Sequence, residues 1–309
     1  MATPAEPPAS SSRPVVVGYN DRPEGRDALA LGAGVAVALG GPLIVTSVYP
    51  SDSVLSPVPT TELRAEAERI AGDGLEWLPD PVEADALALP AASPARGLHD
   101  LAEERHPAAI AVGSSHRGAL GRVLAGTGAT QLLSGSPCPV VVAPRGLADG
   151  APVGLRRIAV GFDDSPESWN ALQRAAALAA ASGASVRVVH ALSPLTLPPN
   201  APLSPADIEL ERRRAGERAT ARAVASLSKA VTPESRLVTG NPVSVLEAEA
   251  RDEIDLLVLG SRGFGPLRRV LLGSVSAELM RQAPCPVMVV PRSVEFDPGA
   301  EGMAGSDAP

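Results

Sequence analysis

The chain has 309 residues, of which 45% are hydrophobic and 20% charged, and its formal net charge is −8. These values indicate a soluble globular protein that is long enough for two domains of ordinary size. Aromatic residues make up only 2% of the chain, and a protein with few stacking side chains and an excess of negative charge is not expected to bind nucleic acid.

In the first half, apolar runs alternate with segments of helical periodicity. Residues 1–13 precede them, and their Pro, Ser and Ala content predicts a disordered tail. One helix is expected to end at Gly40, because glycine readily adopts the left-handed conformation of a helix C-cap. The expected elements of this first domain, residues 14–145, are strand 14–18, helix 23–39, strand 43–49, helix 61–78, strand 82–89, helix 95–105, strand 108–112, helix 127–133 and strand 139–143.

Residues 146–155 contain glycine and proline, as is typical of an interdomain linker, and the pattern then begins again. Ser165 is expected to cap the first helix of this half, and Gly183 to follow its end. The expected elements of this second domain, residues 156–292, are strand 157–162, helix 166–182, strand 185–191, helix 205–230, strand 235–239, helix 243–251, strand 255–259, helix 274–282 and strand 287–290. Residues 293–309 form an acidic tail, expected to be disordered.

The two halves are copies of one domain. Positions of the same type recur at a constant offset, with Gly113, Gly126, Cys138 and Pro144 matching Gly260, Gly273, Cys285 and Pro291. Alternating strands and helices predict an α/β fold with two tandem doubly wound domains, each a parallel sheet flanked by helices. Ligands of such sheets bind outside the carboxyl ends of the strands, where the strand order reverses. Asp163 and Gly260 end the first and fourth strands of the second half and belong to that rim.

Residues 28–51 carry no charge, and a run of this length can span a membrane. However, Gly40-Gly41-Pro42 divides the run into a helical piece and a strand-like piece, and the matching part of the second half contains Arg174 and Arg187. We therefore favour a helix, a turn and a strand in a protein core over a membrane span.

Several features point to the cytoplasm and away from metal-centred or triad catalysis. Residues 1–12 contain neither a basic region nor an apolar core, so a signal peptide is not expected. Cys138 and Cys285 lie far apart, each in a Pro-Cys-Pro triplet, which gives no disulfide framework and no metal spacing. The four histidines form no spaced metal-binding pair, and there is no Gly-x-Ser-x-Gly elbow.

The most informative stretch is residues 255–283. An apolar strand ends at Gly260, a glycine-containing basic loop follows, and Gly273 opens an amphipathic helix. Backbone amides and a helix N-terminus in this arrangement can bind a phosphate chain. The only lysine, Lys229, lies far from the loop, which excludes a Walker-type loop. A dinucleotide fingerprint is disfavoured, because Arg268 occupies the position of its third glycine.

The spacing of Gly260, Gly263 and Gly273 followed by Ser274 resembles the ATP-binding branch of the universal stress protein family. The match includes the first-strand signature Val-Gly-Phe-Asp-Asp-Ser-Pro at residues 160–166 and extends over nearly the whole chain as two copies. The resemblance implies a five-stranded parallel sheet in each domain, with strand order 3-2-1-4-5. It also implies that ATP lies between the first-strand loop and the glycine loop.

The resemblance assigns nucleotide contacts to the second half, at Asp163, Ala191, Gly260, Arg262, Gly263, Gly273, Ser274, Val275 and Ser276. It implies that Asp163 orients the ribose or adenine, or a Mg²⁺ ion on the phosphates, and that the backbone at Ala191 meets adenine. Simpler interpretations remain open for single residues, since Ser274 can act only as an N-cap and Asp163 can cap a turn. No catalytic residue is assigned.

The first half departs from this pattern. His116 stands at the position of the second glycine, Asn20 replaces the acidic residue and Arg22 replaces the capping serine. The weaker candidates in this half are Asn20, Val48, Gly113, Gly126 and Thr127. We predict that the first domain binds nucleotide weakly or not at all, although a neutral asparagine can still hydrogen-bond a ribose.

The closing strands, residues 139–144 and 286–291, are short and apolar and are expected at sheet edges, where strands pair readily with other strands. The resemblance implies that this strand mediates dimerisation. We therefore expect an internal pseudo-dimer of the two halves, and a further homodimer is plausible.

Together these features predict a cytoplasmic ATP-binding stress-response regulator, whose nucleotide modulates signalling or the binding of a protein partner that the sequence does not name. Catalysis is not expected beyond slow ATP hydrolysis. Two alternatives stay open, a nucleotide-independent interaction scaffold and a slow ATPase or phosphotransferase.

Overall fold

The computed structural model describes residues 13–51, 58–79, 82–115, 119–194, 204–261 and 273–292. The terminal segments 1–12 and 293–309, for which disordered tails are predicted, lie outside these ranges.

The described strands form one ten-stranded sheet in the order β3-β2-β1-β4-β5-β10-β9-β6-β7-β8. The strands are β1 Val15–Gly18, β2 Leu43–Pro50, β3 Ala84–Ala91, β4 Ala109–Gly113, β5 Val140–Ala143, β6 Arg157–Gly161, β7 Ser185–Leu192, β8 Thr232–Thr239, β9 Leu256–Gly260 and β10 Val287–Val290. Each half has the predicted order 3-2-1-4-5, and all neighbours within a half are parallel. The predicted fold class is confirmed.

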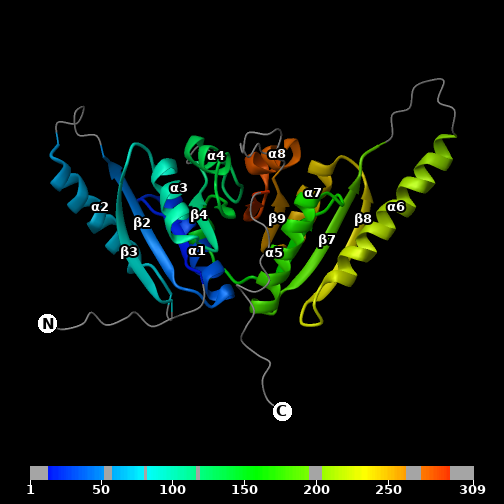
Figure 1. The fold of residues 1–309 in the computed structure, drawn as a ribbon, viewed down its shortest axis with the longest axis horizontal. Coiled ribbons are helices and arrows are strands. Elements are labelled where there is room, and N and C mark those ends of the chain that lie inside the picture. The colour runs from blue at the N-terminus through cyan, green and yellow to red at the C-terminus, as the bar shows by residue number, and fades with distance from the viewer. Residues whose placement is uncertain are drawn as a thin grey trace, which may run out of the picture.

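Helices cover both faces of the sheet (Figure 1). They are α1 Pro23–Leu39, α2 Thr60–Leu75, α3 Pro94–Arg105, α4 Thr127–Leu133, α5 Pro166–Ser182, α6 Pro205–Ser226, α7 Pro242–Ala250 and α8 Ser274–Gln282. One core packs α1, α2, α5 and α6 against the sheet, and a second core packs α3, α4, α7 and α8 against its other face. Both cores contain residues from the two halves.

The two halves join in the middle of the sheet, where β5 and β10 pair antiparallel, with Met288 opposite Val141. The predicted internal pseudo-dimer is therefore present. The expectation that the closing strands lie at sheet edges holds for each half but is wrong for the whole sheet, because each strand covers the other's edge. A homodimer stays a prediction, and it would have to use a different surface from these paired edges.

A loop of the first half also contacts the second half. The amides of Val123 and Ala125 donate to the carbonyls of Ala283 and Met280, both at 2.8 Å. Arg122 donates to the Glu247 carboxylate at 2.8 Å and to the carbonyl of Gln282 at 2.6 Å. The end of α8 is thereby connected to the segment that leads into α4.

The segment predicted as a linker is held against α1 by a buried carboxylate that the sequence did not single out. Asp27 lies in α1 and is only 2% exposed. Its two oxygens accept hydrogen bonds from the amides of Gly146 and Ala148, both at 2.9 Å. These amides lie at the start of a short 3-10 turn, Leu147–Asp149, which would otherwise leave them without partners.

The uncharged run of residues 28–51 forms the rest of α1 and β2 in the core. Gly40 ends α1 in the left-handed conformation at φ 62°, as predicted. Within the ranges that the structure describes, every helix is too short or too polar to cross a membrane.

Element boundaries differ from the predictions in both halves: α2 ends at Leu75, three residues before its predicted end, and β3 lies two residues later than predicted. Strand β8 begins at Thr232, three residues before the predicted start, and includes Pro233. A proline is tolerated there because β8 is the outermost strand, so one side of it needs no ladder hydrogen bond. The preceding helix ends at Ser226, four residues before its predicted end.

Candidate functional site

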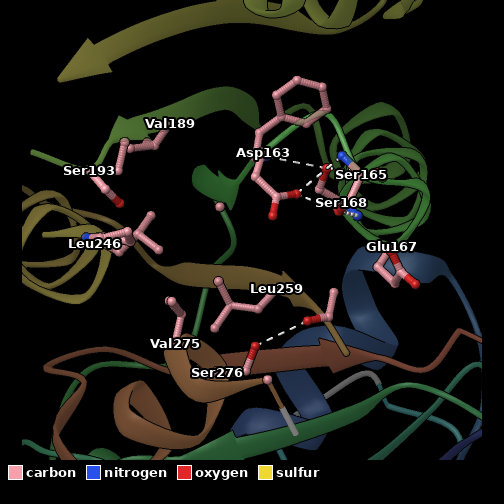
Figure 2. Close-up of a pocket in the computed structure, with 16 residues that line it drawn as sticks. Asp163, Ser165, Glu167, Ser168, Val189, Ser193, Leu246, Leu259, Val275 and Ser276 are labelled. Carbon is pink, nitrogen blue, oxygen red and sulfur yellow. Dashed lines mark hydrogen bonds between the residues drawn. The ribbon is translucent and has the colours of Figure 1, made fainter. Parts of the chain in front are cut away.

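A cavity of about 210 Å³ opens at the carboxyl ends of β6, β7 and β9 in the second domain (Figure 2). The first turns of α5, α7 and α8 complete its wall. The lining residues are Gly161, Phe162, Asp163, Ser165, Glu167, Ser168, Val189, Ala191, Ser193, Pro242, Leu246, Leu259, Gly260, Gly273, Val275 and Ser276. The structure thus brings together six of the nine predicted contacts, Asp163, Ala191, Gly260, Gly273, Val275 and Ser276.

Asp163 is held in place at the mouth of this cavity. Its Oδ1 accepts hydrogen bonds from the amide of Ser165, at 3.2 Å, and from the Ser165 hydroxyl. The Ser165 hydroxyl in turn accepts the amide of Ser168 at 3.3 Å, which makes Ser165 the predicted N-cap of α5. Asp163 therefore does cap a turn, and that turn fixes an exposed carboxylate at the site.

Gly260 is required by packing as well as by any ligand. A Cβ atom at this position would lie 2.4 Å from the carbonyl oxygen of Glu167, in the first turn of α5. The start of α5 therefore requires glycine at this position, independently of any ligand. The Glu167 carboxylate is itself paired with Arg292 at 3.5 Å.

The start of α8 forms the wall opposite Asp163. Gly273 is the N-cap, so the interpretation of Ser274 as the N-cap is wrong, and Ser274 is the exposed first residue of the helix, outside the cavity lining. The Ser276 hydroxyl donates to the carbonyl of Gly260 at 3.1 Å, which ties α8 to the end of β9. Val275 completes this wall with an apolar side chain.

The floor of the cavity is apolar. Val189 and Ala191 come from β7, Leu246 from α7 and Leu259 from β9. Sequence reasoning missed Leu246 and its neighbour Pro242, because nothing in the chain order shows that α7 approaches β7. The only available signal was the cap at Asn241, whose side chain accepts the amide of Val243 at 2.9 Å and starts the helix there.

The remaining predicted contacts, Arg262 and Gly263, lie outside the described residues, as do Arg268, Arg269 and, in the first half, His116.

The first domain contains an equivalent cavity of about 420 Å³, lined among others by Asn20, Val48, Gly113 and Gly126. Thr127 is exposed and lies outside this lining. The N-cap of α1 is Arg22, whose side chain makes no capping hydrogen bond, so the fixed turn of the second domain is missing here. Asn20 donates to Glu24 at 3.5 Å. The first-domain cavity, whose sequence departs from the nucleotide-binding pattern, is therefore the larger one. Cavity size alone does not show which of the two sites binds nucleotide.

His190 lies next to Ala191 on β7, with its ring centroid 6.3 Å from that of Phe162. Burial lowers the pKa of His190 below its ordinary value, while the charges of Asp163 and Asp164 raise it in part. The Nδ1 atom is buried and has no hydrogen-bond partner among the described residues. The neutral imidazole is therefore favoured in the folded protein.

This burial makes the free energy of unfolding dependent on pH. Below about pH 6.5, the ordinary histidine pKa, the unfolded chain binds a proton at His190 more readily than the folded chain does. The contribution of neutral His190 to the free energy of unfolding is thus complete above about pH 6.5, and it is lost as the pH falls through the lowered pKa that His190 has in the folded state. We expect urea midpoints to fall less between about pH 7.5 and about pH 5.5 in a His190→Gln variant than in the wild type. If the urea midpoints of the two proteins fell equally, His190 would not be the group that makes stability depend on pH in this range.

Both cysteines are buried free thiols, and burial raises the pKa of each to about 12. A thiol with such a pKa is protonated near neutral pH and is a poor nucleophile. Cys138 and Cys285 therefore act as core residues at the ends of the two halves.

Comparison with known proteins gives matches along nearly the whole chain. The model of the universal stress protein family matches residues 11–144 and 154–291. One universal stress protein of Mycobacterium tuberculosis is 30% identical over 291 residues, which covers 90% of this chain and 99% of the relative. A second one from the same organism is 29% identical over 296 residues, covering 90% and 97%.

Solved structures share the fold. The crystal structure of a universal stress protein from Archaeoglobus fulgidus has a TM-score of 0.63 at 19% identity and covers 91% of this chain and 99% of its own. A putative universal stress protein from Pseudomonas aeruginosa has a TM-score of 0.63 at 17% identity, with coverages of 91% and 93%.

Proposed function

The chain belongs to the universal stress protein family, and from this premise we propose that it is a cytoplasmic regulator that binds ATP mainly in its second domain. The bound nucleotide changes how the protein associates with a partner or with a second copy of itself. The observation that carries the proposal is the convergence of an apolar floor, a fixed carboxylate and a helix start on one cavity.

Each wall suits one part of a nucleotide. The apolar side chains of Val189, Ala191 and Leu246 offer a surface for the adenine ring. The Asp163 carboxylate can accept hydrogen bonds from ribose hydroxyls, or ligate a Mg²⁺ ion carried by the phosphates. The N-terminus of α8 can present its first-turn backbone amides, which have no partner within the helix, and the positive end of the helix dipole to the phosphates.

The volume of the cavity suggests that it holds only part of the nucleotide. At about 210 Å³ the cavity is smaller than the roughly 300–1,000 Å³ of typical small-molecule pockets. We infer that it holds the base and the ribose, and that the phosphates extend along the start of α8 past Gly273.

The second domain is favoured over the first by its fixed charge. Asp163 is positioned by Ser165, whereas the first domain has Asn20 and an N-cap without a side-chain hydrogen bond. A charged acceptor forms stronger hydrogen bonds to hydroxyl groups than a neutral amide does, by roughly a factor of two.

A route from the nucleotide to the rest of the molecule is present in α8. Its first residues line the cavity, and its end accepts hydrogen bonds from Arg122, Val123 and Ala125 of the first domain. A shift of α8 on nucleotide binding would therefore reach the junction between the halves. This contact supports a regulatory role more than a role in turnover.

The test begins with the untagged protein. It is denatured, and the supernatant is chromatographed for adenine nucleotide. We expect ATP to co-purify, and about 1 mM ATP to raise the melting temperature of the wild type.

Asp163→Ala should weaken ATP binding at least about tenfold, the equivalent of about 1.4 kcal/mol. Asn20→Ala, the matched change in the first domain, should leave it nearly unchanged. If ATP neither co-purifies nor shifts the melting temperature, the proposal is wrong, and phosphate release from ATP would favour the ATPase alternative.

A further inference from the structure

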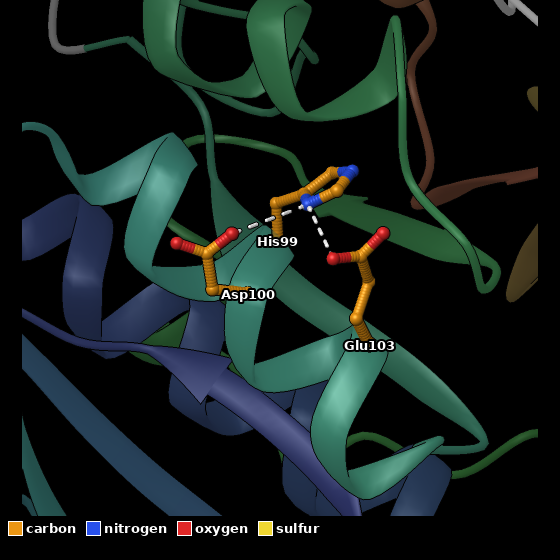
Figure 3. A group of neighbouring side chains, drawn as sticks. All are labelled: His99, Asp100 and Glu103. Carbon is orange, nitrogen blue, oxygen red and sulfur yellow. Dashed lines mark ion pairs between the residues drawn. The ribbon is translucent and has the colours of Figure 1, made fainter.

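A histidine and two carboxylates of α3 lie close together (Figure 3), and none of the three lines either cavity. His99 and Glu103 are four residues apart and so lie on the same side of the helix. The Nδ1 atom of His99 lies 3.6 Å from an oxygen of Asp100 and 3.9 Å from one of Glu103. One ligand atom from each residue falls within 4.8 Å of the other two.

The other ring nitrogen fixes the orientation of His99. Its Nε2 atom lies 3.0 Å from the carbonyl oxygen of Gly135, which follows the end of α4. A carbonyl only accepts hydrogen bonds, so Nε2 carries a hydrogen, and Nδ1 is the ring nitrogen that faces the two carboxylates. Metal-ligating histidines are commonly oriented in this way, by a backbone carbonyl on the second ring nitrogen.

The Nδ1 atom and the two carboxylates face one another without a hydrogen bond between them, since separations of 3.6 and 3.9 Å are too long for one. Nδ1 is indeed buried and without a hydrogen-bond partner among the described residues. A metal ion bound by ligands at about 2.1 Å holds neighbouring ligand atoms about 3.4 Å apart in tetrahedral geometry, close to the observed separations.

We propose that His99, Asp100 and Glu103 bind a divalent transition-metal ion of the zinc class, with water completing its coordination. One imidazole and two carboxylates suit such an ion better than Mg²⁺ or Ca²⁺, which prefer oxygen ligands alone. The Asp100 and Glu103 side chains are 48% and 62% exposed, so they can rotate the short distance that closes the site. Sequence reasoning missed it because only one of the three ligands is a histidine.

Arg96 competes for one of the ligands. Its Nε donates to the Asp100 carboxylate at 3.0 Å. Removal of this guanidinium should free the carboxylate and take away a repulsive charge, so Arg96→Gln is expected to tighten metal binding.

The second domain provides an internal comparison. Helices α3 and α7 both begin with a proline after a capping residue, which places Glu247 at the position of His99 and Arg251 at that of Glu103. Glu247 bonds the guanidinium groups of Arg122 and Arg251 there. The equivalent site already holds cationic side chains, so one metal ion per chain is expected.

Calorimetric titration of the untagged protein with Zn²⁺ tests the proposal, and Co²⁺ absorption reports the ligand set. We expect one bound ion per chain. His99→Gln and Glu103→Gln should each weaken binding at least about tenfold, whereas Glu104→Gln, the same charge change on an exposed neighbour, should not. Melting curves without metal show whether each variant is folded.

Equal Zn²⁺ affinity in Glu103→Gln and Glu104→Gln would overturn the proposal, because the carboxylate of the cluster would then contribute no more than an exposed neighbour does.

Discussion

Val141→Asp is expected to unfold most of the protein. Val141 is fully buried in β5, opposite Met288 of β10, and both side chains belong to the core beneath α1 and α5. An aspartate there must be neutralised or buried with its charge, and changes of this kind cost about 4–5 kcal/mol or more. Domains are stable by only about 5–15 kcal/mol.

The measurement is urea unfolding followed by far-UV circular dichroism, together with the yield of soluble protein. Ser235→Asp is the matched control, because Ser235 is exposed on the outermost strand β8. The wild type and the control should unfold in a single transition. A Val141→Asp variant with the midpoint of the control would show that β5 and β10 do not pair in solution.

Gly273→Glu is expected to abolish ATP binding while the protein stays folded. Gly273 has φ −58° and ψ 155°, a conformation open to residues with a side chain, and a carboxylate at a helix N-cap is favourable. The same carboxylate would face the proposed phosphates. Two like charges about 4 Å apart repel by about 4 kcal/mol at an effective dielectric constant of about 20. A loss of affinity of more than about a hundredfold follows, since each factor of ten is about 1.4 kcal/mol.

Calorimetric titration with ATP measures this loss, and the melting temperature without ATP shows that the variant is folded. Gly126→Glu provides the control, because Gly126 is the N-cap of α4 in the first domain and also has a conformation open to side chains, with φ −72°. If Gly126→Glu removed ATP binding and Gly273→Glu did not, the nucleotide would lie in the first domain and the assignment of the two sites would be reversed.

Much of the site could be predicted because its residues follow strand ends. Gly260 ends β9, and Asp163 follows the end of β6 by two residues. These strands are neighbours in the sheet, and Ala191 lies near the end of β7 on the other side of β6. Ser165 was identifiable as an N-cap from its position before Pro166. Leu246 could not be predicted, because α7 reaches the cavity only through packing against the sheet.

The sequence by itself determined the two copies and the alternation of strands and helices within each, because periodicity and glycine positions are local properties of the chain. The strand order was expected only from the family resemblance. Only the tertiary structure decided how the copies join and which residues share a cavity or a cluster. The pairing of β5 with β10, the carbonyl of Glu167 that excludes a side chain at Gly260, and the contact of His99 with Gly135 all join residues distant in the chain. Such contacts depend on the packing of whole elements, which no local pattern records.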